Sequence, residues 1–292
     1  GELELASDAS EGQRRLKFAE WVANTANPLT ARVIVNRIWQ YHFGSGPIET
    51  PSDFGFNGGL PSHPELLDWL ASEFMAREPS TPHSAFRIPH SWAWSIKRLH
   101  KLIMLSATYR QSSTYNPQAA AIDADNHLFW RFAPRRLEAE TIRDAMLAVS
   151  GELNPQVGGP SFRPLTVTSL LTQFYHLIDD DRPEFNRRTV YRINVNTAKS
   201  PLLDSLDCPA PSITAPKRRT TTTTLQALSL MNDSFVLRQA ERFAQRVRQS
   251  TRHDPNAQIA LAYRLAFGRS PTPDELAMTL RLVQEHGLDS AC

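Results

Sequence analysis

The chain has 292 residues, of which 41% are hydrophobic and 21% charged, a composition typical of a folded globular protein and not of a disordered one. Its 32 basic and 30 acidic residues give a net charge of +2, so there is no general reason to expect nucleic acid as a partner. Two cysteines, Cys208 and Cys292, are too few for a disulfide framework, and no apolar run approaches the roughly 20 residues that span a bilayer.

The first two helices are predicted from capping residues and apolar spacing. Residues 10–23 have the spacing of a capping box at their start, followed by apolar residues at helical intervals. Residues 27–44 combine an apolar stripe with many polar side chains. Asn27 is the expected cap, Pro28 suits the first helical position, and Gly44 suits a left-handed stop. We interpret this second helix as either the wall of a site or a buried polar brace.

Three more helices are predicted in the first half of the chain. Residues 62–76 begin with a capping-box pattern and an early proline, and residues 92–107 carry a strong apolar pattern that predicts a buried helix. Between them, residues 79–89 predict a proline-studded surface connection. A further amphipathic helix is predicted over 136–149, stopped by Gly151.

The second half is predicted to be helical apart from one short strand. Residues 189–195 alternate apolar with polar side chains, the pattern of a strand. Residues 225–247 predict a helix broken near 232–233, and the helix after Asp254 ends at Gly268. The last helix begins with a capping box at 272–275.

These elements predict a mainly α fold, an irregular multi-helix domain with long loops and at most a small β element near 189–195. We expect one domain over 1–292, with a helical N-terminal part over 10–151 and a loop, strand and helical C-terminal part over 152–288. Because the chain starts without methionine, we also expect it to be a fragment of a larger protein.

Many sequence blocks match one known family in the right order. The blocks are residues 27–44, 53–55, 62–70, 97–103 and 106–113, then 135–137 with Glu140, Arg143 and Asp144, then 158–160, 188–191, 207–209, 226–228 with 232–233, and 268–272. Through them the chain resembles, over nearly its whole length, the planctomycete domain of unknown function 1553. Ala210 departs from the family pattern, which often has an acidic residue or asparagine there.

The resemblance implies an exported protein, periplasmic or at the cell surface, that also carries a c-type cytochrome domain and a second domain of unknown function. It implies no catalytic residues, because none is established for the family. The haem motif Cys-x-x-Cys-His is absent from this sequence, so we expect no cofactor in this chain and any haem in a separate domain.

A candidate polar site is suggested by charged and amide side chains in the strongest blocks. On the helix over 136–149, Glu140 and Asp144 lie four residues apart, so both carboxylates share one face and could act as an acid and base pair. The neighbouring arginines favour a structural network of ion pairs instead. The candidate residues are Arg32, Asn36, Arg37, His42, Asp53, His63, Glu140, Arg143, Asp144 and Arg188.

The sequence also bears on the binding of anions, metals and nucleic acid. Lys217, Arg218 and Arg219 precede five threonines and a helix, a setting that could hold phosphate, sulfate or a uronate, although a solvated loop with threonine caps explains it as well. Metal binding is not expected, because no histidine pair has the helical spacing of a zinc protease. Nucleic acid is not expected as a partner, because the net charge is nearly neutral and no recognised binding motif accompanies these clusters.

Three functions follow from these observations. The leading hypothesis is an interaction or substrate-presenting scaffold, because no catalytic signature appears. The alternative is an enzyme that acts on an extracellular glycan or similar polymer together with a cytochrome domain. A weaker alternative is an anion-binding or nucleic-acid-binding module. The expected partners are the cytochrome c domain and the second unknown domain of the same parent protein, with polysaccharide as a further candidate.

Overall fold

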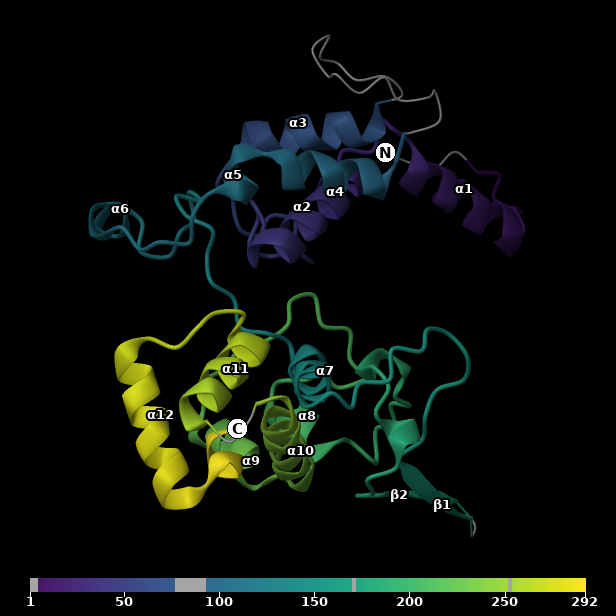
Figure 1. Cartoon of the computed structure of the whole chain (residues 1–292). Helices are drawn as coiled ribbons and strands as arrows, with labels where there is room; N and C mark the ends of the chain where they lie inside the picture. Colours follow the sequence, from purple (N-terminus) through teal and green to yellow (C-terminus); the bar gives the residue numbers. More distant parts are fainter. Residues whose placement is uncertain (1–4, 77–92, 170–171, 252–253) are drawn as a thin grey trace. The chain divides into compact units, whose positions relative to one another are not determined.

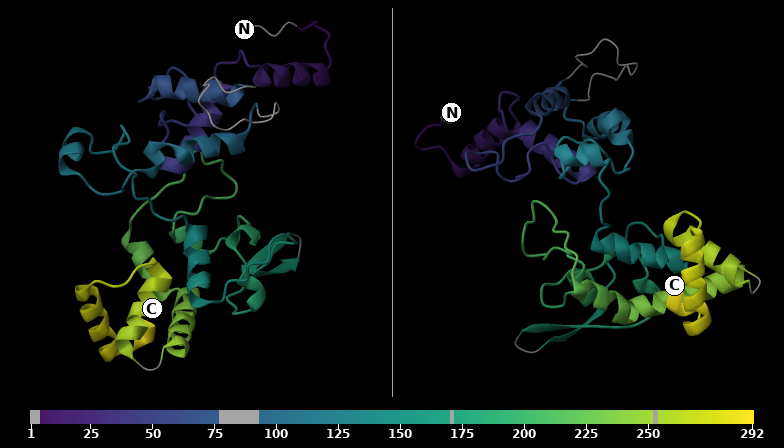
Figure 2. Two further views of the ribbon diagram at one scale, coloured as in Figure 1. Left: turned by 45° about the horizontal axis from the view of Figure 1, so that its top comes forward. Right: turned by 90° about the vertical axis from the view of Figure 1, so that its left-hand side faces the viewer.

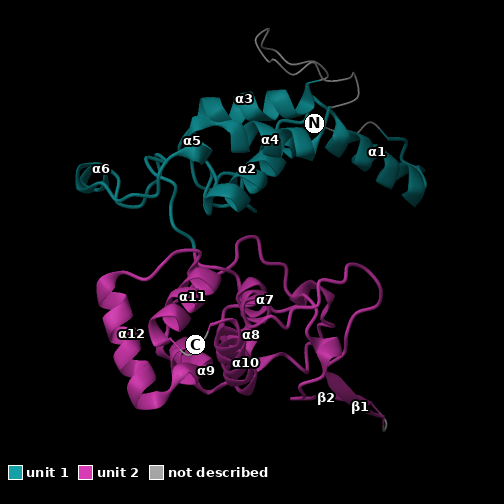
Figure 3. Ribbon diagram, viewed as in Figure 1, with its two compact units in different colours: residues 1–135 teal, residues 136–292 magenta. Residues whose placement is uncertain are grey.

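The computed structural model describes residues 5–76, 93–169, 172–251 and 254–292, and it is mainly helical (Figure 1). It divides into two compact units, Gly1–Arg135 and Arg136–Cys292, which are coloured separately in Figure 3. The predicted mainly α class is confirmed. The expected single domain stays a prediction, because two compact units can work together as one domain. The proline-rich connection predicted over 79–89 lies outside the described residues.

Helices make up the regular structure of the first unit. They are α1 (Glu11–Ala23), α2 (Thr30–Phe43), α3 (Pro64–Met75), α4 (Ile96–Leu105), α5 (Ala107–Arg110) and α6 (Pro117–Ile122). The capping box at Ser10 and the stop at Gly44, whose φ is 87°, are confirmed. Gly44 suits this left-handed position because it has no Cβ to clash with the backbone.

Two predicted helix starts are wrong by one or two residues. Helix α2 begins at Thr30, and the Asn27 Oδ1 atom accepts the backbone N–H of Leu29 at 2.9 Å, so Asn27 holds the turn before the helix. Helix α3 begins at Pro64 after His63, and the expected capping box is absent there. Short polar side chains favour such turns as readily as caps, which explains both errors.

The core of the first unit forms where α2, α3 and α4 pack together. Residues at helical spacing on α2 supply its largest part, and the rings of Trp39 and Phe43 stack with centroids 4.4 Å apart. The buried apolar side chains of these three helices are Ala31, Val35, Ile38, Trp39, Phe43, Leu67, Leu70, Ala71, Phe74, Leu99 and Ile103. This packing holds α2 in place, and with it the backbone positions from which its polar side chains project.

The second unit combines helices with one hairpin. Its elements are α7 (Ala139–Ser150), β1 (Leu165–Ser169), β2 (Gln173–Leu177), the 3₁₀ helices η1 (Pro183–Phe185) and η2 (Thr189–Tyr191), α8 (Pro201–Ser205), α9 (Thr224–Asn232), α10 (Ser234–Ser250), α11 (Pro255–Phe267), α12 (Pro273–His286) and α13 (Leu288–Ala291). The predicted break at 232–233 is confirmed, because the Asp233 side chain accepts the backbone N–H of Phe235 and caps α10. The caps at Asp254 and Thr272 are also as predicted.

The β element predicted over 189–195 is misplaced. Residues Thr189–Tyr191 form η2, whereas the one sheet of the described residues pairs β1 with β2 in antiparallel register, Leu165 opposite Leu177. Figure 2 shows this hairpin projecting away from the helices of its unit. The apolar residues of this segment do not share a buried face, because Val190 is 70% exposed whereas the polar Thr189 is buried.

Two apolar clusters hold the second unit together. In the first, Ala139 of α7 packs with Leu202, Leu203 and Leu206 at α8. The second joins α10 to α13 through Phe243, Ala244, Val247 and Leu288. Helix α7 therefore packs against both α8 and α10. These contacts hold the helix that carries Glu140, Arg143 and Asp144. None of the described helices combines the length and the apolar character needed to cross a membrane.

Candidate functional site

In the first unit, two of the candidate residues link α2 to its surroundings. The Arg32 Nε atom lies 2.6 Å from Asp68 on α3, and this guanidinium holds the pKa of Asp68 below its ordinary value. Asn36 is fully buried, donates to the carbonyl of Ile48 at 3.0 Å and accepts the backbone N–H of Ile48 at 2.8 Å. A Cβ on Gly46 would come within 2.5 Å of the Asn36 side chain, so the loop backbone lies directly against this amide. Asn36 is a brace for the loop after α2.

His42 pairs with a second histidine from α4. Its Nε2 atom lies 2.7 Å from Nδ1 of His100, and the ring of Tyr109 stands edge-on to His42 with centroids 5.5 Å apart. Burial lowers the pKa of His42, and the charges of His100 and Arg135 lower it further. No third histidine, cysteine or carboxylate joins the pair to make a metal-binding group in the described part of the chain.

Because the pKa of His42 is lowered in the folded state, we expect the first unit to lose stability as the solution is acidified. The unfolded His42 takes up a proton near its ordinary pKa of 6.5, while the folded residue resists protonation, so stability falls as pH drops below about 6.5. All six tryptophans lie in this unit, so their fluorescence follows its unfolding. The urea midpoint should fall between about pH 7.5 and about pH 5.5 in wild type.

The matched control is the exposed His286 of the second unit. His42→Gln should show a smaller fall of the fluorescence midpoint over the same pH interval, whereas His286→Gln should behave as wild type. An equal fall in wild type and His42→Gln would show that other groups cause the acid sensitivity.

The other three candidates of this unit have separate surroundings. Arg37 is exposed on α2 and makes no hydrogen bond or ion pair with a described residue. The Asp53 Oδ1 atom accepts the backbone N–H of Gly55 at 2.9 Å in a turn, and His63 precedes α3 with its Nδ1 2.9 Å from the hydroxyl of Ser62. Among the described residues, none of the six candidates in this unit is bonded to another. They do not form one site there.

In the second unit, by contrast, the four candidates share one neighbourhood. The Asp144 Oδ1 atom accepts both the backbone N–H and the hydroxyl of Thr189, at 2.7 and 2.6 Å. Arg143 lies 3.6 Å and Arg188 3.8 Å from the carboxylate of Asp144. The hydroxyl of Thr189 also lies 3.4 Å from the backbone carbonyl of Glu140. These contacts fasten η2 to α7.

Arg143 is the most buried cation of this group, only 8% exposed. It donates to the backbone carbonyls of Phe185 and Arg187 at 2.6 and 3.1 Å, and its guanidinium lies 5.1 Å from the centre of the Phe235 ring. Burial lowers the pKa of Arg143 to about 10, and it stays charged at neutral pH. Its role is to hold the backbone of 185–189 against α7.

Glu140 is held by a residue predicted for a different site. Arg218 donates to its Oε2 atom at 2.7 Å and also lies 3.5 Å from Glu138. Burial alone would raise the pKa of Glu140, but the Arg218 guanidinium and neighbouring donors hold it below its ordinary value. Lys217 and Arg219 remain exposed and have no bonded partner in the described residues. The basic cluster 217–219 is therefore divided, and its middle residue neutralises Glu140.

A polar network that the sequence did not suggest lies beside this ion pair. The carboxylate of Asp207, whose φ is 67°, accepts the backbone N–H of Thr221 at 2.8 Å and the amide of Gln226 at 3.1 Å. Arg136 lies 3.4 Å from the same carboxylate. The sequence did contain a hint of this network, because residues 207–209 and 226–228 both belong to the blocks that match the family. This network fixes the loop that carries Cys208.

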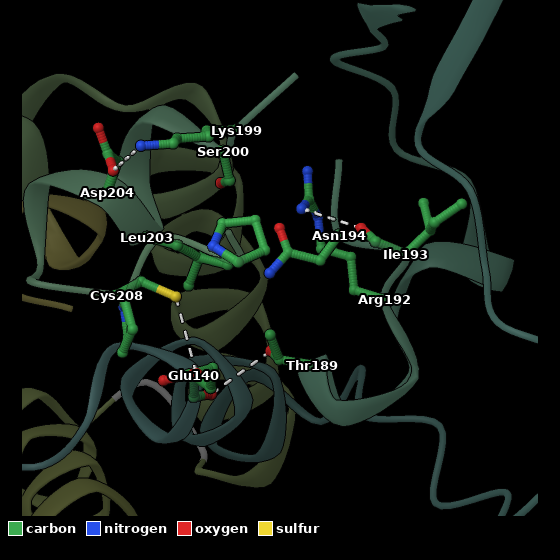
Figure 4. Close-up of a pocket in the computed structure, with 12 residues that line it drawn as sticks. Glu140, Thr189, Arg192, Ile193, Asn194, Lys199, Ser200, Leu203, Asp204 and Cys208 are labelled. Carbon is green, nitrogen blue, oxygen red and sulfur yellow. Dashed lines mark hydrogen bonds and ion pairs between the residues drawn. The ribbon is translucent and has the colours of Figure 1, made fainter. Parts of the chain in front are cut away.

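A small pocket opens where these elements meet (Figure 4). It has a volume of about 80 Å³. Figure 4 shows Arg192 and Asn194 on one side, with Glu140 and Cys208 from other elements facing the same space. The lining residues are Glu140, Thr189, Arg192, Ile193, Asn194, Lys199, Ser200, Leu203, Asp204, Cys208, Pro209 and Pro211. Of the sequence-predicted candidates, only Glu140 lines it.

Cys208 is a poor nucleophile in this pocket. Its Sγ lies 3.7 Å from the Oε1 atom of Glu140, and burial together with that carboxylate raises the pKa of the thiol to about 11. A thiol acts as a nucleophile through its thiolate, which is scarce at neutral pH under these conditions. The site therefore lacks the activated cysteine of a thiol enzyme.

Alkylation should report this environment directly. With a thiol pKa of about 11 instead of 9.0, Cys208 should react with iodoacetamide roughly 100-fold more slowly than an ordinary thiol at mildly alkaline pH. Glu140→Gln removes one cause of the raised pKa and should speed the reaction. Peptide mass spectrometry separates Cys208 from Cys292, whose pKa burial raises to about 12. Fast alkylation of wild-type Cys208 would contradict this description.

Fold and pocket together define a mainly helical protein in which the described carboxylates near the pocket are paired with cations or backbone donors. The chain belongs to the family described as PSD1, protein of unknown function (DUF1553), whose model matches residues 14–283. The resemblance of the sequence blocks to domain of unknown function 1553 is thus confirmed. No curated protein and no solved structure matches the chain.

Proposed function

We propose that this chain is a non-catalytic binding module, a scaffold that presents a ligand or substrate to other domains of a larger protein. The proposal rests on the observation that both candidate catalytic carboxylates already have bonded partners within the protein. Glu140 is paired with Arg218, and Asp144 is bonded to Thr189. A general acid or base must exchange a proton with a reacting group, and a carboxylate held ionised by a cation does this poorly. Cys208 is equally unsuited to attack a substrate.

The setting of this module is part of the proposal. We place it in an exported protein, periplasmic or at the cell surface, alongside a c-type cytochrome domain and a second domain of unknown function. This chain would hold no cofactor of its own, and haem would belong to the cytochrome domain. The support is the series of sequence blocks that resemble planctomycete proteins of this arrangement. Mass spectrometry of the native protein from a periplasmic fraction should find haem-bearing peptides on the same polypeptide.

The two alternative functions, an enzyme and an anion-binding or nucleic-acid-binding module, have less support from the contacts of the candidate residues. An enzyme acting on an extracellular polymer would need a free carboxylate at the pocket, and both carboxylates that line it, Glu140 and Asp204, lie within 4 Å of a cation. An anion-binding module centred on 217–219 loses Arg218 to the ion pair with Glu140. Nucleic acid gains no support, because the net charge of the chain is only +2.

Affinity electrophoresis with soluble polysaccharides tests the binding function. The whole chain is run through gels that contain polygalacturonate, alginate, a sulfated galactan or a neutral galactan. We expect retardation by at least one acidic polymer, with no shortening of the polymer after long incubation. Unchanged mobility in every gel would overturn polysaccharide binding, and shortened polymer would favour the enzyme alternative.

A further inference from the structure

One cation at the pocket differs from all those around it. Arg218 is paired with Glu140, Lys199 lies 3.6 Å from Asp204, and Arg143 lies 3.6 Å from Asp144. Arg192, half-buried, has no carboxylate within ion-pair distance among the described residues. Within the described part of the chain, its guanidinium makes a single hydrogen bond, to the neighbouring backbone carbonyl of Ile193 at 3.3 Å.

An unpaired guanidinium in such a place is unfavourable without an anion. Burial lowers the pKa of Arg192, which shows that its surroundings disfavour the charge. Removing a cation from water costs free energy that a hydrogen-bonded counter-ion recovers. A guanidinium presents parallel N–H groups that match the two oxygens of a carboxylate. Arg192 therefore lines the pocket as a half-buried cation whose guanidinium can bind an anionic ligand.

Other groups that line the pocket can recognise hydroxyls. Glu140 is ionised and can accept a hydrogen bond, while the amide of Asn194 and the hydroxyl of Ser200 both donate and accept. A sulfate ion presents only acceptor oxygens, so it can pair with Arg192 but has no hydroxyl to donate to the carboxylate of Glu140. A carboxylate with a hydroxyl on a neighbouring carbon offers a partner both to Arg192 and to these hydroxyl-binding groups.

We propose that the pocket lined by Arg192, Asn194 and Glu140 binds the carboxylate end of a hydroxylated acid of the sugar-acid type. Arg192 holds the carboxylate, Asn194 and Ser200 contact its neighbouring hydroxyl, and Glu140 accepts from a hydroxyl on the far side. A volume of about 80 Å³ admits this acid group and the carbons next to it, while the rest of the ligand extends through the open mouth. This inference rests on the proposed binding function and names the ligand class of that function.

Calorimetric titration of the whole chain tests the proposal, with D-galacturonate as the probe and D-galactose and sulfate as comparisons. Wild type should bind galacturonate and neither comparison compound. Arg192→Gln should weaken binding about 10-fold or more, because a charge-assisted hydrogen-bonded contact is lost. Arg219→Gln is the matched control: it removes an exposed, unpartnered arginine outside the pocket and should leave the affinity unchanged.

Asn194→Asp provides a second variant that does not disturb the core. Asn194 is exposed, so the fold should persist, and the added carboxylate should repel the probe and weaken binding. Wild-type affinity in both Arg192→Gln and Asn194→Asp would overturn the proposal. Equal binding of sulfate or of galactose would overturn the ligand class.

Comparing polysaccharide binding with galacturonate binding shows which of the two proposals fails, the binding function or its assignment to this pocket. If an acidic polysaccharide retards the chain but Arg192→Gln is retarded equally, the binding function stands and this pocket is not its site. If galacturonate binds at Arg192 but no polymer does, the pocket serves a free small acid and the proposed polysaccharide function fails. Loss of binding in Arg219→Gln alone would move the site to 217–219.

Discussion

Replacing Asn36 by alanine is expected to lower the free energy of unfolding of the first unit by about 2–5 kcal/mol. The side chain is fully buried and satisfies both backbone groups of Ile48, which is itself only 6% exposed. Alanine leaves an N–H and a carbonyl buried without partners, and each costs about 1–3 kcal/mol. Tryptophan fluorescence during urea unfolding measures the change, since every tryptophan of the chain lies in this unit.

Arg37→Ala is the matched control on the next position of the same helix. Arg37 is exposed and has no bonded partner in the described residues, so its replacement should change stability by less than about 0.5 kcal/mol. If Arg37→Ala destabilised the unit strongly and Asn36→Ala only weakly, then Arg37, and not Asn36, would be the structural residue of α2.

Arg143→Met is expected to destabilise the second unit by about 2–5 kcal/mol. Methionine keeps much of the apolar contact with Phe235 but leaves the backbone carbonyls of Phe185 and Arg187 without their donor. Because this unit contains no tryptophan, the loss should appear in far-UV circular dichroism without a matching fluorescence change. The segment from η1 to η2 also carries one wall of the pocket, so galacturonate binding should weaken in the same variant.

The neighbouring Arg188→Met serves as its control. Arg188 is 56% exposed and lies 3.8 Å from Asp144, an arrangement that contributes less than about 1 kcal/mol in most proteins. Comparable destabilisation by Arg143→Met and Arg188→Met would show that charge near Asp144, and not the buried hydrogen bonds, holds this segment.

Helix boundaries could be predicted wherever a cap has a distinct residue pattern. Ser10, Asp233 and Thr272 cap their helices as predicted, and Gly44 and Gly151 end theirs with positive φ. The hairpin over 165–177 was missed because both of its strands are mostly exposed, so neither shows the one-sided burial that alternation reveals. A strand was predicted over 189–195 because apolar and polar residues alternate there. The contact of Thr189 with Asp144, which ties η2 to α7 instead, is invisible in sequence.

The candidate site could be predicted only in part. The i, i+4 spacing placed Glu140 and Asp144 on one helix, which is α7, and both carboxylates lie near arginines, as the structural interpretation of that charge pattern predicts. Arg192, Asn194 and Lys199 were missed because they come from an irregular segment, where residue spacing implies no spatial neighbourhood. Arg218 was assigned to an anion site because its partner Glu140 is distant in sequence.

The helix over 30–43 illustrates how a polar signature can be structural. Arg32, Asn36 and His42 each contact a different element: α3, the loop after α2, and α4. Such contacts fix three elements around one helix without creating an open site. The brace interpretation of this helix therefore has direct support at Asn36, whereas Arg37 faces solvent.

The most direct test of the central claim, that the carboxylates of α7 are structural and not catalytic, is a product assay with the acidic polymer that the chain binds. New reducing ends are measured over a long incubation with wild type, Glu140→Gln and Asp144→Asn. We predict none above the protein-free rate in any sample, together with retained binding of the polymer by wild type. Reducing ends released by wild type and abolished by Glu140→Gln would contradict the account and assign Glu140 to catalysis.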